Sequence, residues 1–425
     1  MNEIKPFIKR DVFEDLKKHL LKKEMTLIAG PRQAGKTTLM MLLKKHLELS
    51  GKKTVFLSLD FENDQKFFLS QNSLVEKLKL EFGNSEGYVF IDEIQRKEDA
   101  GVFLKGIYDM ALPYKFIISG SGSVELKEKI HESLAGRKAM FEIFPVSFSE
   151  FVNFKTEYKY SDRLDNYFAV ENKKTVELLA EYLNFGGYPR VVTEDTLEEK
   201  RRIISEIYSS YMEKDIAYLL KIEKLDAFNS LVKILASQTG KMINYSELSN
   251  TVGISAVTVR NYLWYLEKTF ITEAVSPYFK NARKEITKSP VIYFHDIGFR
   301  NYSLGLFGKA SETDGSGFVF QNFIFNVLKI KFLFSGAKIN YWRTKEKAEV
   351  DFVASSGDKL IPIEVKYADI KKPEINRSFR SFIEKYSPEK AFIVNKSFKG
   401  SLIVGKTEIN FIPFWELIGK DIFNS

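Results

Sequence analysis

A glycine-bounded segment near the start of the chain constrains the fold more than any other feature. Residues 30–37 read GPRQAGKT and fit G-x-x-x-x-G-K-[ST] in full, between an apolar run at 26–29 and a helix expected at 36–49. Glycines let backbone N–H groups turn towards phosphate oxygens, and the following helix adds its positive end. The segment therefore predicts a phosphate-binding loop between a strand and a helix.

The loop assigns roles to its residues and predicts ATP with Mg²⁺ as the ligand. Lys36 supplies a positive charge for the β- and γ-phosphates, and Thr37 supplies a hydroxyl for Mg²⁺. The expected nucleotide contacts are Gly30, Pro31, Arg32, Gln33, Ala34, Gly35, Lys36, Thr37 and Thr38.

A second apolar run, YVFIDEIQ at 88–95, follows the loop by about 55 residues and ends in two acids. We expect Asp92 to hold Mg²⁺ through water and Glu93 to activate the attacking water. A small-molecule kinase transfers phosphate to an acceptor other than water and does not need an acid that activates water. The adjacent pair Asp92 and Glu93 therefore favours ATP hydrolysis over such a kinase.

Two further residues are candidates for the same site. Ser119 ends another apolar run and is expected beside the γ-phosphate, although a plain strand-ending turn explains it equally well. Arg137 follows a glycine turn and is expected as an arginine finger, in its own subunit or in a neighbouring one. An ordinary surface arginine is the alternative.

The first third of the chain alternates short apolar runs with amphipathic segments, which predicts an α/β fold with a parallel sheet. The expected strands are 25–29, 54–59, 88–91, 115–119 and 139–144, and the expected helices are 36–49 and 98–111. A mostly helical stretch follows at 147–224, and residues 186–189 (GGYP) interrupt it.

Composition excludes several kinds of site and leaves the partner open. The chain has 425 residues and no cysteine, so disulfides, thiolate zinc sites and cysteine nucleophiles are excluded. A net charge of +8 fits either a polyanionic partner or a solvated lysine surface. No leader and no apolar run of about 20 residues is visible, so we expect a cytoplasmic protein.

The middle of the chain contains a helix-turn-helix pattern. Residues 245–255 read as a helix, a glycine turn and a new helix that begins at Ser255, with Val259, Leu263 and Leu266 on its buried side. The outward-facing residues are then Thr258, Arg260 and Asn261, and a wing near 279–286 adds Lys280, Arg283 and Lys284. DNA binding and protein docking both remain open for this element.

Two carboxylates and a lysine form a candidate second site near the C-terminus. Asp351 lies in EVDFV, and Glu364 and Lys366 lie in IEVK, where alternation places both on one face of a strand. Two carboxylates that bind Mg²⁺ and a lysine that polarises water are the groups that phosphodiester cleavage needs. The D-x(n)-E-x-K pattern is permissive, because many charged hairpins match it.

Several motifs in this order resemble one family: GPRQAGKTT, YVFIDEIQ, FIISGSGS, ESLAGR, IFPVSFSEF and FGGYP. The chain resembles the archaeal and bacterial AAA ATPases that carry a C-terminal restriction-endonuclease-like domain of the PD-(D/E)xK type. The resemblance runs over essentially the whole chain. It implies an AAA-type ATPase core at 1–155, a helical lid at 156–225, a winged helix at 226–302 and a nuclease-like α/β domain at 303–425.

The same resemblance implies ATP chemistry for Lys36, Thr37, Asp92 and Glu93, a sensor position for Ser119 and a finger-like role for Arg137. One position departs from the family pattern. Gln321 stands where relatives usually have a glutamate, so the nuclease-like site loses a charge and should bind a divalent metal less well.

These patterns together predict a Mg²⁺-dependent AAA-type ATPase that acts as a molecular switch or a DNA-associated machine. A nucleotide-gated protein-binding module with slow hydrolysis is one alternative, and a Mg²⁺-dependent DNA nuclease is another. The expected partners are ATP and, as open alternatives, DNA, a second copy of the chain or another protein.

Overall fold

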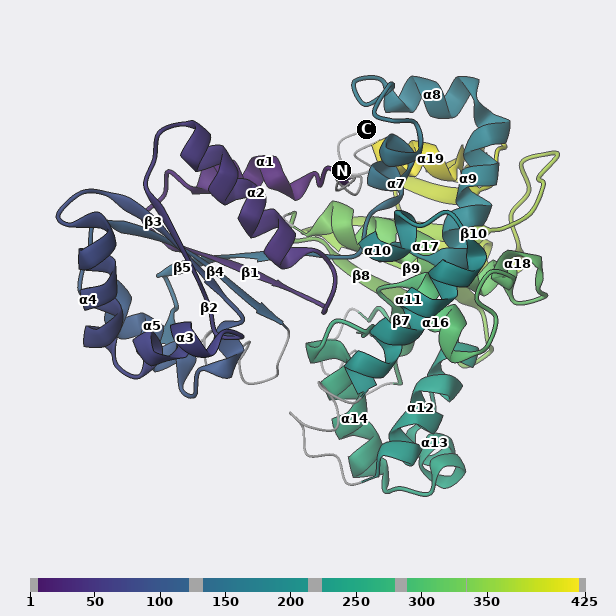
Figure 1. Ribbon diagram of the computed structural model, residues 1–425. Coiled ribbons are helices and arrows are strands. Elements are labelled where there is room, and N and C mark those ends of the chain that lie inside the picture. Colours follow the sequence, from purple (N-terminus) through teal and green to yellow (C-terminus); the bar gives the residue numbers. More distant parts are fainter. Residues whose placement is uncertain (1–6, 122–132, 213–223, 280–288, 334, 420–425) are drawn as a thin grey trace.

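The computed structural model describes residues 7–121, 133–212, 224–279, 289–333 and 335–419. Figure 1 shows a smaller lobe on the left, built around one sheet, and a larger lobe on the right that contains the rest of the chain. The phosphate-binding loop belongs to the smaller lobe, and elements of the larger lobe contact it.

The sheet of the smaller lobe is parallel throughout and has the strand order β2-β3-β4-β1-β5. Its strands are β1 (Met25–Gly30), β2 (Thr54–Ser58), β3 (Gly87–Asp92), β4 (Tyr114–Ser121) and β5 (Lys138–Glu142). Buried apolar side chains line both of its faces. This confirms the α/β prediction, because a parallel sheet needs apolar residues towards the helices on both sides.

Helices cover the two faces of this sheet (Figure 1). The helices and one-turn helices of this lobe are α1 (Val12–His19), α2 (Lys36–Leu49), α3 (Glu62–Gln65), η1 (Lys66–Phe68), α4 (Gln71–Phe82), η2 (Ile94–Arg96) and α5 (Ala100–Asp109). Residues of α1 and α2 pack in one core with one face, and residues of α4 and α5 pack in another core with the other face. The observed α2 has the bounds expected from the sequence.

The second sheet has six strands in the order β12-β13-β11-β10-β9-β8. Its strands are β8 (Lys338–Arg343), β9 (Glu349–Ser356), β10 (Lys359–Lys366), β11 (Lys390–Asn395), β12 (Gly400–Val404) and β13 (Thr407–Pro413). β10 and β11 are parallel, as are β11 and β13, whereas the other neighbours are antiparallel. Gln321 lies on the apolar helix α17 (Ser316–Phe332), and the EVDFV and IEVK segments lie on the paired strands β9 and β10.

One large core joins the early helices to this second sheet. The helices in it are α7 (Phe148–Lys155), α8 (Leu164–Val170), α9 (Asn172–Phe185), α17 and α19 (Phe414–Gly419), while α18 (Arg377–Tyr386) packs on the other face of the sheet. Phe148 contacts aromatic rings from three of these helices, Tyr182, Phe323 and Phe414. Hydrophobic packing therefore joins α7–α9 to the C-terminal sheet, although the sequence separates them by well over a hundred residues.

A further core forms the middle of the chain. Its elements are α10 (Pro189–Val192), α11 (Leu197–Ser210), α12 (Leu225–Ser237), α13 (Tyr245–Val252), α14 (Ala256–Lys268), β6 (Thr272–Val275), β7 (Val291–Phe294) and α16 (Ile297–Ser303). The one-turn helix η4 (Ala310–Glu312) leads from it to α17. The helix, glycine turn and second helix that the sequence predicts from residue 245 belong to this core as α13 and α14.

The helix-turn-helix geometry is present in α13 and α14. Gly253 ends α13 with a φ of 67°, a left-handed conformation that favours glycine. The Ser255 hydroxyl accepts the N–H of Thr258 at 3.0 Å and so caps α14. Arg260 and Asn261 are exposed on α14, whereas the expected wing falls almost wholly outside the described residues, Lys280, Arg283 and Lys284 included.

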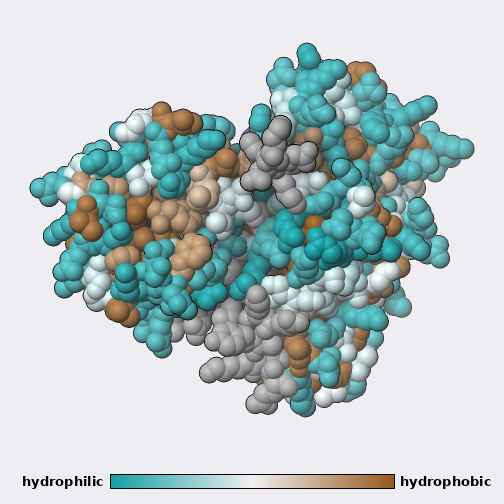
Figure 2. Space-filling view, viewed as in Figure 1, coloured by the Kyte–Doolittle hydropathy of each residue, from teal (hydrophilic) through white to brown (hydrophobic). Residues whose placement is uncertain are grey.

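Figure 2 presents one face of the molecule, coloured by the hydropathy of its residues. Figure 2 shows a mostly hydrophilic face, with apolar residues scattered over it and more of them on the smaller lobe. Among the described residues, no helix is long and apolar enough to cross a bilayer.

Lys138, at the start of β5, gives a test of this fold that depends on pH. Its ammonium is enclosed and has no hydrogen-bond partner among the described residues, and burial lowers its pKa from 10.5 to about 8. Below pH 8 the folded chain therefore carries a partly desolvated charge that the unfolded chain leaves in water. The desolvated charge lowers the free energy of unfolding, and this destabilisation disappears as the pH rises from 8 to above 10.5, where the lysine is neutral in both states.

We expect Lys138→Met to raise the free energy of unfolding by about 1–2 kcal/mol at pH 7, a value reduced for the half-buried position of the lysine. The gain should shrink steadily between pH 8 and pH 10. Urea unfolding at several pH values measures it, and Lys45→Met, at an exposed lysine on α2, is the control. A gain that does not change with pH would contradict the assignment.

Candidate active site

The phosphate-binding loop lies where β1 ends and α2 begins. Gln33 and Gly35 have positive φ values of 59° and 96°, which turn the loop sharply before the helix. A Cβ atom on Gly30 would lie 2.3 Å from the carbonyl oxygen of Ile143, so only glycine fits there. The buried Lys36 ammonium donates to the carbonyl oxygens of Gly30 and Pro31 at 3.0 and 2.8 Å. The first two residues of the loop thus hold the ammonium of Lys36 in place.

Three predicted residues meet at the ends of neighbouring strands. The Thr37 hydroxyl donates to Oδ2 of Asp92 at 2.9 Å, and the buried Ser119 hydroxyl donates to Oδ1 of the same carboxylate. Asp92 ends β3, and Ser119 lies on the adjacent β4. Because parallel strands end at one edge of the sheet, residues far apart in sequence converge there.

Glu93 follows Asp92 in a left-handed conformation with a φ of 57°. Its N–H donates to the Ser119 hydroxyl at 3.2 Å, and its carboxylate accepts a hydrogen bond from Gln95 on η2. A non-glycine residue at this φ is uncommon and strained, so contacts with its surroundings must hold it in this conformation. The hydroxyl and the amide thus fix the direction in which the Glu93 carboxylate points.

Arg137 does not join this group. Its backbone carbonyl accepts the N–H of Met25, the first residue of β1, and its side chain pairs with Asp109 at 2.8 Å. Met25 and the phosphate-binding loop lie at opposite ends of β1. The expectation of a finger acting within the same chain is therefore corrected, because one strand length separates Arg137 from the loop. A role in a neighbouring copy stays a prediction.

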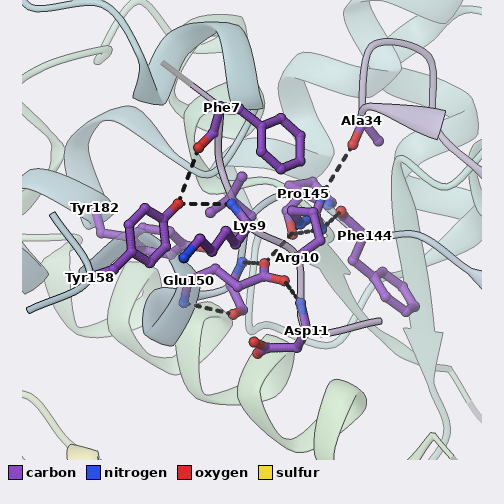
Figure 3. Close-up of polar contacts among 12 residues, drawn as sticks. Phe7, Lys9, Arg10, Asp11, Ala34, Phe144, Pro145, Glu150, Tyr158 and Tyr182 are labelled. Carbon is purple, nitrogen blue, oxygen red and sulfur yellow. Dashed lines mark hydrogen bonds and ion pairs between the residues drawn. The ribbon is translucent and has the colours of Figure 1, made fainter. Parts of the chain in front are cut away.

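A buried ion pair that was not predicted from the sequence braces the loop (Figure 3). Arg10 contacts Oε2 of Glu150 at 3.1 Å, and the two side chains are 7% and 6% exposed. The guanidinium also donates to the carbonyl oxygens of Ala34, in the loop, and of Phe144, after β5, at 3.0 and 2.7 Å. Glu150 belongs to a capping box that begins α7 at Ser147. Arg10 therefore joins the loop to the larger lobe.

A cavity of about 250 Å³ lies beside the loop. Its lining comes from the N-terminal segment, the loop with α2, and α10: Phe7, Ile8, Arg10, Gly35, Thr38, Leu39, Pro189, Arg190 and Thr193. Arg190 donates to Oε1 of Gln33 at 3.1 Å and pairs with Glu206 at 3.2 Å. The sequence marked residues 186–189 only as a helix breaker, but proline at the first position of a helix was a signal for a new wall element.

The C-terminal candidates also lie together. Asp351 accepts the backbone N–H of Val365 at 2.7 Å, and Glu364 accepts from Lys366 at 2.7 Å and from the Asn376 amide at 2.8 Å. Burial raises the pKa of Asp351 well above its usual value, and the nearby Glu364 raises it further. The pairing of β9 with β10 thus brings Asp351 close enough to Glu364 for the two carboxylates to repel each other.

Gln321 closes this cluster from α17. Its amide nitrogen donates to Oδ1 of Asp351 and to the hydroxyl of Tyr293, both at 3.0 Å. Oε2 of Glu364 is buried and has no hydrogen-bond partner among the described residues. The cluster thus contains one carboxylate oxygen, Oε2 of Glu364, without a partner among the described residues. It also contains the amide of Gln321, which donates to Asp351 at a position where a glutamate would repel it.

Three family descriptions match successive parts of the chain. Residues 22–152 match an AAA domain, residues 176–310 match a domain of unknown function (DUF8612), and residues 316–417 match a second one (DUF4143). The smaller lobe, with its parallel sheet and its phosphate-binding motif, is therefore similar to an AAA domain. The match at 316–417 includes the carboxylate cluster but assigns it no activity.

Relatives span most of the chain without adding an activity. An uncharacterised protein of Methanocaldococcus jannaschii is 26% identical over 95% of this chain and 90% of its own length. One of Haemophilus influenzae is 25% identical over 80% and 82%. Among solved structures, AMPPCP-bound DnaA from Aquifex aeolicus is 17% identical over 62% of this chain and 90% of its own, with a TM-score of 0.26.

The Arg10–Glu150 pair leads to a prediction about stability. We expect Arg10→Met to lower the free energy of unfolding by about 3 kcal/mol, because it leaves the Glu150 carboxylate buried without its partner. The control is Arg202→Met, since Arg202 pairs with Glu199 but is 57% exposed, and we expect a loss below about 1 kcal/mol. Urea unfolding measures both, and equal losses would contradict the bracing role.

Proposed function

We propose that this chain is a Mg²⁺-dependent AAA-type ATPase that works as a molecular switch or a DNA-associated machine. The observation that carries the proposal is the Asp92 carboxylate, which accepts hydrogen bonds from Thr37 in the loop and from Ser119 on the next strand. A hydroxyl and a carboxylate at this distance, next to the buried Lys36 of the loop, are groups that a Mg²⁺-nucleotide needs.

In the proposed reaction, water attacks the γ-phosphorus of ATP and the bond to the bridging oxygen breaks, which releases ADP and phosphate. Glu93 accepts the proton of the attacking water, and Lys36 stabilises charge on the phosphate oxygens. Thr37 and Asp92 would hold Mg²⁺, which supplies charge neutralisation at the phosphates when bound. Ser119 orients Asp92 and holds the N–H of Glu93, so it links the two acids.

The cavity beside the loop supports the placement of the adenine base. It is continuous with Gly35 and Thr38, and its apolar surface comes from Phe7, Leu39 and Pro189. Apolar walls with a few polar groups suit a flat heterocycle. The base would then touch both the N-terminal segment and α10, while the phosphates stay on the loop.

Lys36→Ala should lower phosphate release from ATP by a hundredfold or more, because the phosphates lose their positive partner. Glu93→Gln should also abolish release but keep nucleotide binding, since an amide cannot accept the proton. Malachite-green assays measure release, and fluorescent-nucleotide titration measures binding. The control is Lys45→Ala, at an exposed lysine on the same helix. Equal release from Lys36→Ala and wild type would sink the ATPase proposal.

The same assay separates the two versions of this function. The helix-turn-helix of α13 and α14, with Arg260 exposed, supports the DNA-associated version. That version requires duplex DNA to bind at low salt and to change the turnover of ATP, and it requires Arg260→Ala to weaken both effects. If DNA does neither, the nucleotide-gated protein-binding switch is the version that stands.

A Mg²⁺-dependent nuclease is the second candidate, and the unpaired Oε2 of Glu364 beside Asp351 favours it. These two acids would hold the metal, and Lys366 would orient a water. The Gln321 amide fits less well, since it donates a hydrogen to Asp351 at the place where an oxygen ligand is needed. The cluster therefore fits a weak metal site better than a tight one.

Gln321→Glu should tighten Mn²⁺ binding by about tenfold or more, because it adds a charged oxygen ligand next to Asp351. Calorimetric titration with Mn²⁺ measures the affinity, and cleavage of plasmid DNA measures activity. Under the nuclease proposal, wild type cleaves slowly, Gln321→Glu cleaves faster and Lys366→Ala does not cleave. Plasmid that stays intact with wild type and with Gln321→Glu would refute this candidate.

A further inference from the structure

Four consecutive residues, 293–296, contact both the segment that leads into α10 and the helix α17. Side chains of α17 hold the first three of them one after another. The contacts are Gln321 to the Tyr293 hydroxyl at 3.0 Å, Asn322 to the N–H and carbonyl of Phe294 at 2.8 and 2.7 Å, and Asn326 to the carbonyl of His295 at 3.1 Å. The end of β7 is therefore attached to α17 by hydrogen bonds as well as by packing.

The fourth residue, Asp296, faces the other way. Its carboxylate is 4% exposed, accepts the N–H of Phe299 at 2.7 Å and so caps α16. Its second oxygen accepts the N–H of Gly187 at 2.7 Å. One buried carboxylate thus joins the start of α16 to the segment that enters α10. Buried charges that accept several N–H groups hold their partners firmly, since separation would leave the carboxylate unsatisfied.

Two glycines make this contact as close as backbone allows. A Cβ atom on Gly186, which has a φ of 75°, would lie 2.4 Å from the nitrogen of Gly298. One on Gly187 would lie 2.3 Å from the carbonyl oxygen of Val146, whose own N–H donates to the Gly187 carbonyl at 2.7 Å. The segment is clamped from both sides, so it has little room to move independently of α16.

Directly after this clamp comes the wall of the cavity. Pro189, Arg190 and Thr193 line it, and Arg190 reaches Gln33 in the loop at 3.1 Å. If α10 shifts when nucleotide binds, the hydrogen bond between Gly187 and Asp296 would transmit the shift to Asp296 and then to residues 293–295. Gln321, which contacts both Tyr293 and Asp351, lies at the far end of the same chain of contacts.

We propose that Asp296 is a positioning residue for the nucleotide cavity, and that residues 293–296 couple nucleotide binding to the arrangement of α17 around Gln321. The proposal rests on the proposed ATP site. By linkage, the coupling works in both directions: whatever fixes α17 also changes the affinity for nucleotide. The nucleotide site and the carboxylate cluster thereby become parts of one regulated unit.

Hydrogen–deuterium exchange with and without mant-ADP and Mg²⁺ tests the coupling in the full chain. In wild type, we expect nucleotide to slow exchange in peptides that cover 291–296 and 317–326, in addition to the loop. Asp296→Asn replaces one carboxylate oxygen with an amide that cannot accept an N–H. It should weaken mant-ADP binding about tenfold and remove the protection of 317–326. The control is Asp226→Asn, at an exposed aspartate in the first turn of α12.

Each outcome decides one claim. Wild type that binds mant-ADP but shows no change at 317–326 overturns the coupling and leaves the ATP site standing. Asp296→Asn that binds and exchanges like wild type overturns the positioning role. Wild type that does not bind mant-ADP, or binds it no better than Lys36→Ala, contradicts the proposed function itself. If Asp296→Asn does not fold, as judged by circular dichroism, the wild-type exchange pattern alone decides the coupling.

Discussion

The buried ion pair between Arg10 and Glu150 is the interaction on which the relation of the two lobes depends. Its guanidinium contacts the loop through Ala34 and the exit of the first sheet through Phe144, while its carboxylate partner starts α7 in the larger lobe. Two charges this deeply enclosed are costly to separate, because either one alone would remain desolvated. The phosphate-binding loop is therefore held by the larger lobe as well as by its own sheet.

A second constraint is the edge at which the strands of a parallel sheet end. Thr37, Asp92, Glu93 and Ser119 come from three separate segments, and hydrogen bonds connect all four. The sheet places their backbones, and the two hydroxyls then orient the acids. A site built in this way has its polar groups aligned before any ligand enters, which lowers the cost of binding and of reaching a transition state.

In the C-terminal cluster, Gln321 contacts Asp351, while the strands β9 and β10 position Asp351, Glu364 and Lys366. Asp351, Glu364 and Lys366 occupy neighbouring positions on β9 and β10, as their alternation requires. The amide of Gln321 donates a hydrogen bond to Asp351, at a position where a third carboxylate would repel it. The same amide contacts Tyr293, so Gln321 also connects the cluster to the middle of the chain.

The sequence alone determined the local chemistry: the loop from Gly30 to Thr37, the two acids at the end of β3, the cap at Ser255 and the alternation around Glu364. Each depends on backbone conformation or strand periodicity over a few residues, which local sequence encodes. Only the tertiary structure decided that Arg10 and Arg190 reach the loop, that Arg137 does not, and that α7–α9 pack on the C-terminal sheet. These depend on contacts between residues up to hundreds of positions apart, for which a single sequence carries no periodic signal. The phosphate-binding motif remains the strongest evidence for function, but the structure shows which other elements hold it in place.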